Sequence, residues 1–205
     1  MKYKLAIFDM DGTILDTLVD LANAVNHALA EKNLPQRSLM EIRSYLGNGM
    51  LNLIRLSAPK GASDAEISEL KDIFTNYYKA HCAENTKPYS GILELIAELR
   101  AQGVKTAVVS NKPDFGVQLL VEEHFPTSFD FAVGEKEGIA KKPAPESVKA
   151  VLEKLNISLP KFSQLLLFAI SFGSLLLLSF KNCIYLSTVN LDLIKYNSFI
   201  FLLLF

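Results

Sequence analysis

The chain contains few cysteines and has almost no net charge. Its 205 residues include two cysteines, Cys82 and Cys183, and the formal net charge is −1. Two widely spaced cysteines exclude a disulfide framework and a zinc-ligand pattern, and are typical of a reduced, cytoplasmic protein. A nearly neutral chain gives no reason to expect a nucleic acid as a partner. Residues 1–4 lead directly into an apolar segment, so no cleavable signal peptide is expected.

Charged residues almost disappear after residue 161. Only Lys181, Asp192 and Lys195 are charged between positions 162 and 205. Residues 162–180 contain no charge, which meets the length criterion for a membrane-spanning helix, and residues 199–205 are wholly apolar. Large exposed apolar segments associate with one another or with membranes. We therefore expect the expressed chain to be insoluble, or to associate with membranes through residues 162–180.

Two carboxylates close together mark the start of the chain. Asp9 and Asp11 follow the apolar segment 5–8, which reads as a strand, and Gly12 permits a tight turn after them. Residues i and i+2 of a strand point the same way, so both carboxylates can converge on one ligand. They repel each other unless a cation or a shared proton lies between them. A calcium loop is the alternative, but it needs Glu at the twelfth position, where this chain has Asp20.

Hydrophobic periodicity divides the rest of the chain into two kinds of structure. Helical spacing fills residues 17–84, with helices expected from residue 18 to 29 and over 39–46, 50–56 and 64–83. Beyond residue 89, helices (92–102, 114–124, 145–155) alternate with strands (105–109, 129–133). This alternation predicts an α/β fold, a parallel sheet covered on both faces. Ligands of such sheets bind beyond the carboxyl ends of the strands, where Asp9, Asp11 and Ser110 all fall.

Two further motifs could contact an anion. Ser110 and Asn111 end an apolar strand and offer a hydroxyl and an amide to an anionic oxygen, although such a pair also serves as a helix cap. Lys142 directly precedes Pro143, which begins a helix. Its ammonium could neutralise a phosphoryl oxygen and a nearby carboxylate. A pair of lysines such as Lys141 and Lys142 is otherwise an ordinary solvated surface.

In this order, the three motifs closely resemble those of the haloacid dehalogenase-like (HAD) hydrolases, which are mainly magnesium-dependent phosphatases. Within that superfamily, residues 45–49, 81–91 and 110–113 look most like phosphoglycolate phosphatases. The resemblance covers about residues 1–160. It implies a Rossmann-like core formed by residues 1–16 and 85–161, an inserted all-helical cap formed by residues 17–84, and a tail, 162–205, of non-family character.

The resemblance also implies a role for each motif. Asp9 would attack phosphorus to form an aspartyl phosphate, and Asp11 would act as general acid and then as general base. Mg²⁺ would be held by Asp9, the backbone carbonyl of Asp11 and a further carboxylate from a fourth motif. Ser110, Asn111 and Lys142 would bind the phosphate of a small phosphorylated metabolite. Gly47, Asn48 and Gly49 would form a cap loop that reaches the substrate, although a plain helix-to-helix turn fits the same residues.

The chain departs from the family pattern at the fourth motif. The family has an apolar strand ending in Gly-Asp with a second Asp after it, whereas Asp192 is the only acidic residue after Glu153. The C-terminal part of the core is therefore missing or replaced, and we expect the phosphatase to be impaired. A frameshift or disrupted gene end would explain the loss and the apolar tail together; a membrane anchor on an incomplete domain is the competing explanation.

Residues 165–170 could still fill the open sheet position beside the Asp9 strand as a buried parallel strand, without bringing a catalytic group. Two other functions remain open. One is a sugar-phosphate mutase of the same superfamily, which would use the same two aspartates. The other is a catalytically dead, membrane-attached binding protein built on this domain.

Overall fold

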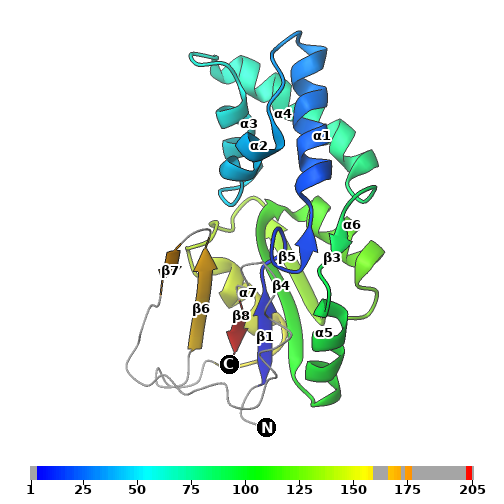
Figure 1. Cartoon of the computed structure of the whole chain (residues 1–205). Helices are drawn as coiled ribbons and strands as arrows, with labels where there is room; N and C mark the ends of the chain where they lie inside the picture. Colours follow the sequence, from blue (N-terminus) through cyan, green and yellow to red (C-terminus); the bar gives the residue numbers. More distant parts are fainter. Residues whose placement is uncertain (1–3, 159–165, 172–173, 177–201, 205) are drawn as a thin grey trace.

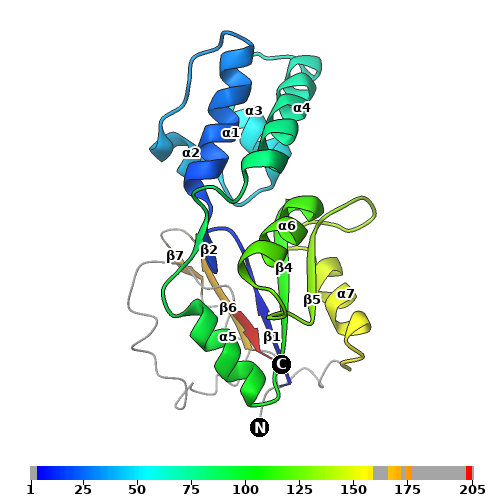
Figure 2. The ribbon, with the colours of Figure 1, turned by 90° about the vertical axis from the view of Figure 1, so that its right-hand side faces the viewer.

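The protein consists of a sheet with flanking helices and a separate group of four helices beyond one end of the sheet (Figures 1 and 2). The computed structural model describes residues 4–158, 166–171, 174–176 and 202–204. The four-helix group comprises α1 (Leu18–Glu31), α2 (Leu39–Tyr45), α3 (Met50–Ser57) and α4 (Asp64–His81). All four helices were expected, and their observed bounds differ from the expected ones by no more than two residues.

The sheet has six strands in the order β5-β4-β1-β8-β6-β7. Its first half consists of β1 (Leu5–Phe8), β4 (Lys105–Pro113) and β5 (Phe131–Glu135). These three strands are parallel, with Ala6 opposite Thr106 and Val108 opposite Ala132. The register between β4 and β5 shifts after Val109, so the carboxyl end of β4 is irregular. The prediction of a parallel α/β sheet is confirmed.

Helices cover both faces of the parallel strands, as the sequence pattern predicts. On one face, Leu5 and Ile7 pack with Val151 of α7 (Glu146–Lys154). On the other face, Phe8 belongs to the large core that also receives α5 (Ile92–Ala101) and α6 (Asp114–His124). Side chains of β1 alternate between the two faces because successive residues of a strand point in opposite directions. All four residues of β1 are fully buried, which fixes the strand that leads into the candidate site.

The strand beside β1 differs from the one expected. That position is taken by β8 (Leu202–Leu204), which runs antiparallel to β1. The expected segment does form a strand, β6 (Leu166–Ser171), but it pairs with β8 on the far side and then with β7 (Ser174–Leu176). The prediction overlooked that the apolar segment 199–205 competes for the same edge of β1. Both segments satisfy the exposed backbone groups of a sheet edge equally well.

The expected membrane-spanning helix over residues 162–180 is not found at the described positions of that segment. Residues 166–171 and 174–176 are strands, and the rest of that segment lies outside the described residues. Among the described residues, no helix is both long enough and apolar enough to cross a membrane.

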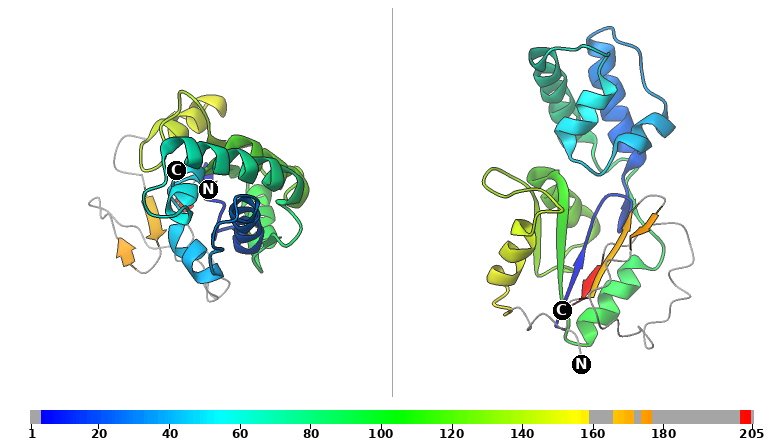
Figure 3. Two further views of the ribbon diagram at one scale, coloured as in Figure 1. Left: turned by 90° about the horizontal axis from the view of Figure 1, so that it is seen from above. Right: turned by 90° about the vertical axis from the view of Figure 1, so that its left-hand side faces the viewer.

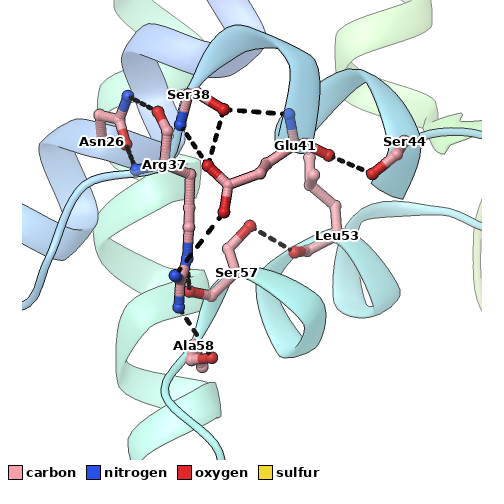
Figure 4. Close-up of polar contacts among 8 residues, drawn as sticks. All are labelled: Asn26, Arg37, Ser38, Glu41, Ser44, Leu53, Ser57 and Ala58. Atoms are coloured by element: carbon pink, nitrogen blue, oxygen red, sulfur yellow. Dashed lines mark hydrogen bonds and ion pairs between the residues drawn. The ribbon is translucent and has the colours of Figure 1, made fainter.

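Arg37 ties three helices of the four-helix group together (Figure 4). Its backbone N–H donates to Asn26 Oδ1 of α1 at 2.8 Å, and the Asn26 amide donates back to the Arg37 carbonyl at 2.9 Å. The guanidinium Nε donates to the Ser57 carbonyl at the end of α3 at 2.8 Å. Next to Arg37, Ser38 and Glu41 form a capping box that starts α2. The long connection from α1 to α2 is thereby held by side chains.

The chain passes between the sheet and the four-helix group twice, and we call these two connecting segments the crossings (Figure 3). The two crossings pair with each other as the short antiparallel strands β2 (Leu15–Asp16) and β3 (Lys87–Pro88). Just beyond this pair, the buried carboxylate of Asp20 in α1 accepts hydrogen bonds from both Asn85 and Thr86 at 2.8–3.0 Å. The outgoing and returning segments of the chain are thus joined at one point.

Candidate active site

Asp9 and Asp11 lie where β1 ends and the chain turns toward the four-helix group. Gly12 adopts a φ of 71°, which favours glycine, and its N–H donates to the Leu15 carbonyl at 2.9 Å. The backbone N–H of Met10 donates to Asp9 Oδ1 at 2.8 Å. The side chains of Asp9 and Asp11 remain 28% and 22% exposed, so a ligand can reach both.

Lys142 brings a positive charge to Asp9. Its Nζ lies 2.8 Å from Asp9 Oδ1 and donates to the Val109 carbonyl at 2.9 Å. The neighbouring Lys141 is placed differently, since its Nζ pairs with Glu135 Oε1 at 2.8 Å. Of the two adjacent lysines, Lys142 is therefore the one beside the carboxylate at the end of β1.

A second lysine, Lys112, contacts the other aspartate. Its Nζ lies 2.8 Å from Asp11 Oδ1, and the Thr17 hydroxyl donates to the same oxygen at 2.7 Å. The Lys112 side chain is only 2% exposed and its Nζ lies 4.9 Å from the centre of the Tyr78 ring of α4. Burial alone would lower the pKa of Lys112, but the Asp11 carboxylate and Tyr78 outweigh it and raise that pKa above its usual value.

The sequence reasoning assigned no role to Lys112, although a signal was present. Lys112 lies two residues after Ser110 along the same strand, so the two side chains point to the same side. The Ser110 hydroxyl oxygen accepts a hydrogen bond from the Lys112 N–H at 3.2 Å, and Ser110 is buried. The contact of Lys112 with α4 could not be predicted from neighbouring residues, because Tyr78 lies 34 residues earlier in the chain.

Asn111 connects two loops through its side-chain amide. Nδ2 donates to the Gly47 carbonyl at 3.0 Å and to the Lys142 carbonyl at 3.2 Å. Oδ1 accepts from the Lys142 N–H at 2.8 Å. The structure therefore places Asn111 against the backbone of Lys142 and of the loop that links α2 to α3.

That loop, Gly47 to Gly49, approaches the end of β4 closely. Gly47 and Gly49 both adopt positive φ, at 104° and 84°. A Cβ at Gly49 would lie 2.9 Å from Glu135 Oε2, 3.0 Å from Lys141 Nζ and 3.2 Å from the Asn111 carbonyl oxygen. The close approach requires glycine at position 49. This close approach places the loop between α2 and α3 beside Asn111 and Lys141.

Asp9 and Asp11 are the residues of this site that could hold a magnesium ion. Mg²⁺ in proteins is bound by one or two carboxylates and completes its coordination with water and substrate phosphate. The backbone N–H of Met10 and Lys142 Nζ both contact Oδ1 of Asp9, and Lys112 Nζ and the Thr17 hydroxyl both contact Oδ1 of Asp11. Within the described part of the chain, no cluster of three acidic, histidine or cysteine side chains could hold a metal. The Asp9 carboxylate and the backbone carbonyl of Asp11 are oxygen donors of the kind that fit Mg²⁺.

The geometry defines a class of protein: an α/β sheet with a pair of aspartates just after β1 and a lysine that reaches them from the loop between β5 and α7. Residues 6–161 match the family model of the haloacid dehalogenase-like hydrolases. The chain belongs to this family. The match ends where charged residues disappear from the sequence, in agreement with the expected limit of the resemblance.

Phosphoglycolate phosphatases are prominent among the similar proteins. The enzyme of Pseudomonas syringae pv. tomato is 33% identical over 160 residues, which cover 75% of this chain and 58% of that protein. The enzyme of Mannheimia succiniciproducens is 33% identical over 167 residues, covering 76% of this chain and 73% of its own length. The chain thus spans less than two thirds of the first of these relatives.

Solved structures agree with the sequence relatives. A protein from Lactobacillus delbrueckii subsp. bulgaricus, assigned by prediction as a phosphoglycolate phosphatase, is 40% identical with a TM-score of 0.70. The alignment covers 77% of this chain and 75% of that one. Its counterpart from Haemophilus somnus, assigned in the same way, is 30% identical with a TM-score of 0.71, over 77% and 73% of the two chains.

Proposed function

We propose that this chain is a phosphomonoester hydrolase that acts through an aspartyl phosphate on Asp9. The observation that carries the proposal is the convergence of Asp9, Asp11 and Lys142, with Lys142 Nζ 2.8 Å from Asp9 Oδ1. A carboxylate nucleophile beside a fixed ammonium suits attack on a phosphoryl group, because the ammonium offsets the repulsion between two anions.

Each residue has a separate task in the proposed reaction. An Asp9 carboxylate oxygen attacks phosphorus, and the bond from phosphorus to the leaving oxygen breaks. Asp11 donates a proton to that oxygen, then accepts a proton from the water that hydrolyses the aspartyl phosphate. Lys142 neutralises the nucleophile and a phosphoryl oxygen, and the hydroxyl of Ser110, in the last part of β4, would bind another. Asn111 acts on the phosphate by holding the backbone of Lys142.

Mg²⁺ would be held by Asp9 and Asp11, where its charge would offset that of the phosphoryl group. Among the described residues, no third acidic, histidine or cysteine side chain completes a metal cluster with them, which supports the proposed loss of the fourth-motif carboxylate. Loss of several kcal/mol of metal stabilisation would slow turnover by about two orders of magnitude or more. We therefore propose an impaired enzyme.

The substrate we propose is 2-phosphoglycolate or a small phosphorylated acid like it, on the basis of the relatives named above. Residues 1–16 and 85–161 would act as the core and residues 17–84 as the cap. The loop Gly47, Asn48 and Gly49 is the part of the cap that lies against the carboxyl end of β4, so it would contact the part of the substrate that does not react.

The test is phosphate release from 2-phosphoglycolate by the full chain with excess Mg²⁺. Asp9→Asn keeps the size of the side chain but removes the nucleophilic charge, so release should fall to background. Asp16→Asn is the matched control, because Asp16 is exposed and accepts only a long hydrogen bond of 3.4 Å. Release by the parent chain no faster than by Asp9→Asn would overturn the proposal.

A further inference from the structure

Lys112 is a buried ammonium that the proposed reaction does not use. Its side chain is 2% exposed and its one carboxylate partner among the described residues is Asp11, at 2.8 Å. The aliphatic part of the side chain lies over Gly116 of α6, where an added Cβ would meet Lys112 Cε at 3.3 Å. Enclosed in this way, Lys112 cannot reach a substrate. Of the two aspartates, Lys112 contacts Asp11, the one proposed to transfer protons.

The four-helix group reaches Asp11 by two routes. Thr17, at the N-cap position of α1, makes no capping hydrogen bond and instead donates its hydroxyl to Asp11 Oδ1 at 2.7 Å. Tyr78 of α4 presents its ring to Lys112 Nζ at 4.9 Å, within range of a cation–π interaction. Tyr78 is itself 2% exposed, and its hydroxyl has no hydrogen-bond partner among the described residues. The ring face therefore carries the contact.

A purely stabilising role explains Lys112 poorly. A buried ion pair loses hydration, and an apolar side chain of similar volume often serves stability equally well. What an apolar side chain cannot do is fix the direction of a carboxylate. A general acid must lie within hydrogen-bond reach of the leaving oxygen, so its orientation decides the rate of proton transfer.

We propose that Lys112 is a positioning residue that orients Asp11 for proton transfer, and that Tyr78 makes this orientation depend on the position of α4. The inference rests on the proposed role of Asp11 as general acid and base. It assigns to the buried side of the site a function that Lys142 cannot supply, because Lys142 contacts Asp9.

Leaving groups of different basicity separate positioning from general damage. The glycolate alkoxide of 2-phosphoglycolate needs a proton as it leaves, whereas the p-nitrophenolate of p-nitrophenyl phosphate leaves without one. In single-turnover experiments with Mg²⁺, Lys112→Met should slow release of glycolate about 100-fold or more, the usual contribution of a general acid. Release of p-nitrophenol should fall less than about tenfold. Lys105→Met is the matched control on the same strand, since Lys105 pairs with Asp130, and should change neither rate.

Equal losses for the two substrates, or no loss, would overturn the positioning role while leaving the proposed function intact. No release of either leaving group by the parent chain would instead refute the proposed function, and the positioning role with it. The two failures are therefore distinguishable.

The link to α4 has its own measurement, which needs no activity. Tyr78→Leu removes the ring, while Tyr78→Phe keeps the ring and removes only the hydroxyl. A double-mutant cycle of Tyr78→Leu with Lys112→Met, followed by urea unfolding, should show a coupling of about five- to thirtyfold in the unfolding equilibrium constant. The cycle with Tyr78→Phe should show less than about twofold. Additive effects in the Tyr78→Leu cycle would refute the link.

Discussion

Replacing Asp20 with asparagine should destabilise the chain more than any other single loss of charge in the four-helix group. The Asp20 carboxylate is 2% exposed and accepts from the N–H and Nδ2 of Asn85 and from the N–H and hydroxyl of Thr86. Asparagine offers one accepting oxygen in place of two. Its NH₂ group would face N–H donors, which cannot accept.

The size of the effect follows from the N–H groups that lack an acceptor. The Oδ2 side of Asp20 receives the Thr86 N–H and hydroxyl, both at 2.8 Å. In asparagine the Thr86 hydroxyl can turn and accept from the NH₂ group, but the Thr86 N–H and the amide N–H that faces it are both left unsatisfied. A buried unsatisfied donor costs about 1–3 kcal/mol, so Asp20→Asn should lower the free energy of unfolding by about 4 kcal/mol. With a urea m-value of about 2 kcal/mol per molar, the unfolding midpoint should fall by about 2 M.

Urea unfolding followed by circular dichroism measures this shift directly. Asp16→Asn, four residues earlier and exposed, is the control and should move the midpoint by less than about 0.3 M, as surface substitutions do. Thr86→Val removes one of the donors, so in combination with Asp20→Asn its own effect should shrink. A midpoint for Asp20→Asn within error of the control would refute the reasoning that this carboxylate joins the two crossings.

Two further predictions concern the ends of β4. Burial opposes ionisation of Asp130, but hydrogen bonds from the Thr106 N–H and Lys105, with the charge of Arg100, lower its pKa below the ordinary 3.8. Asp130 therefore stabilises the fold above its unfolded-state pKa and loses that effect as pH falls through the folded value. Asp130→Asn should cost about 2 kcal/mol at pH 7 and much less at pH 3, measured by urea unfolding at both values. At the other end, Gly49→Ala should weaken the contact of the loop with β4 and cost about 1–2 kcal/mol.

Each of these has a matched comparison. An equal cost of Asp130→Asn at both pH values would show that its charge contributes nothing. Gly61→Ala shares a positive φ of 86° but meets nothing within 4 Å, so it measures the backbone strain alone. If the two glycine variants lose equal stability and protect the Gly47 region equally from hydrogen exchange, the close approach at Gly49 is unimportant.

Local patterns were enough to predict most of the elements. The helices of the four-helix group are bounded by signals that act within a few residues, such as the capping boxes Ser38 with Glu41 and Ser63 with Glu66. Asp9, at the end of β1, lies at the edge of the sheet where ligands of such folds bind, as its position predicts. Lys142 reaches Asp9 from the loop between β5 and α7.

Contacts between distant segments could not be predicted in the same way. The sequence offered two apolar segments for one position beside β1, and only the three-dimensional arrangement selects β8. His27 of α1 stacks on Tyr77 of α4 with ring centres 4.2 Å apart, because the two helices pack side by side. Lys112 was passed over because its partners, Asp11 and Tyr78, belong to different elements.

The hydrogen bond from Asn111 to the Gly47 carbonyl has a consequence for how often the site is open. A single hydrogen bond of this kind contributes about 1 kcal/mol net, which changes a population ratio about fivefold. This bond therefore biases the loop toward β4 without locking it there. Because the same amide also holds the backbone of Lys142 at 2.8 Å, each departure of the loop would leave that lysine in place, ready for the next substrate.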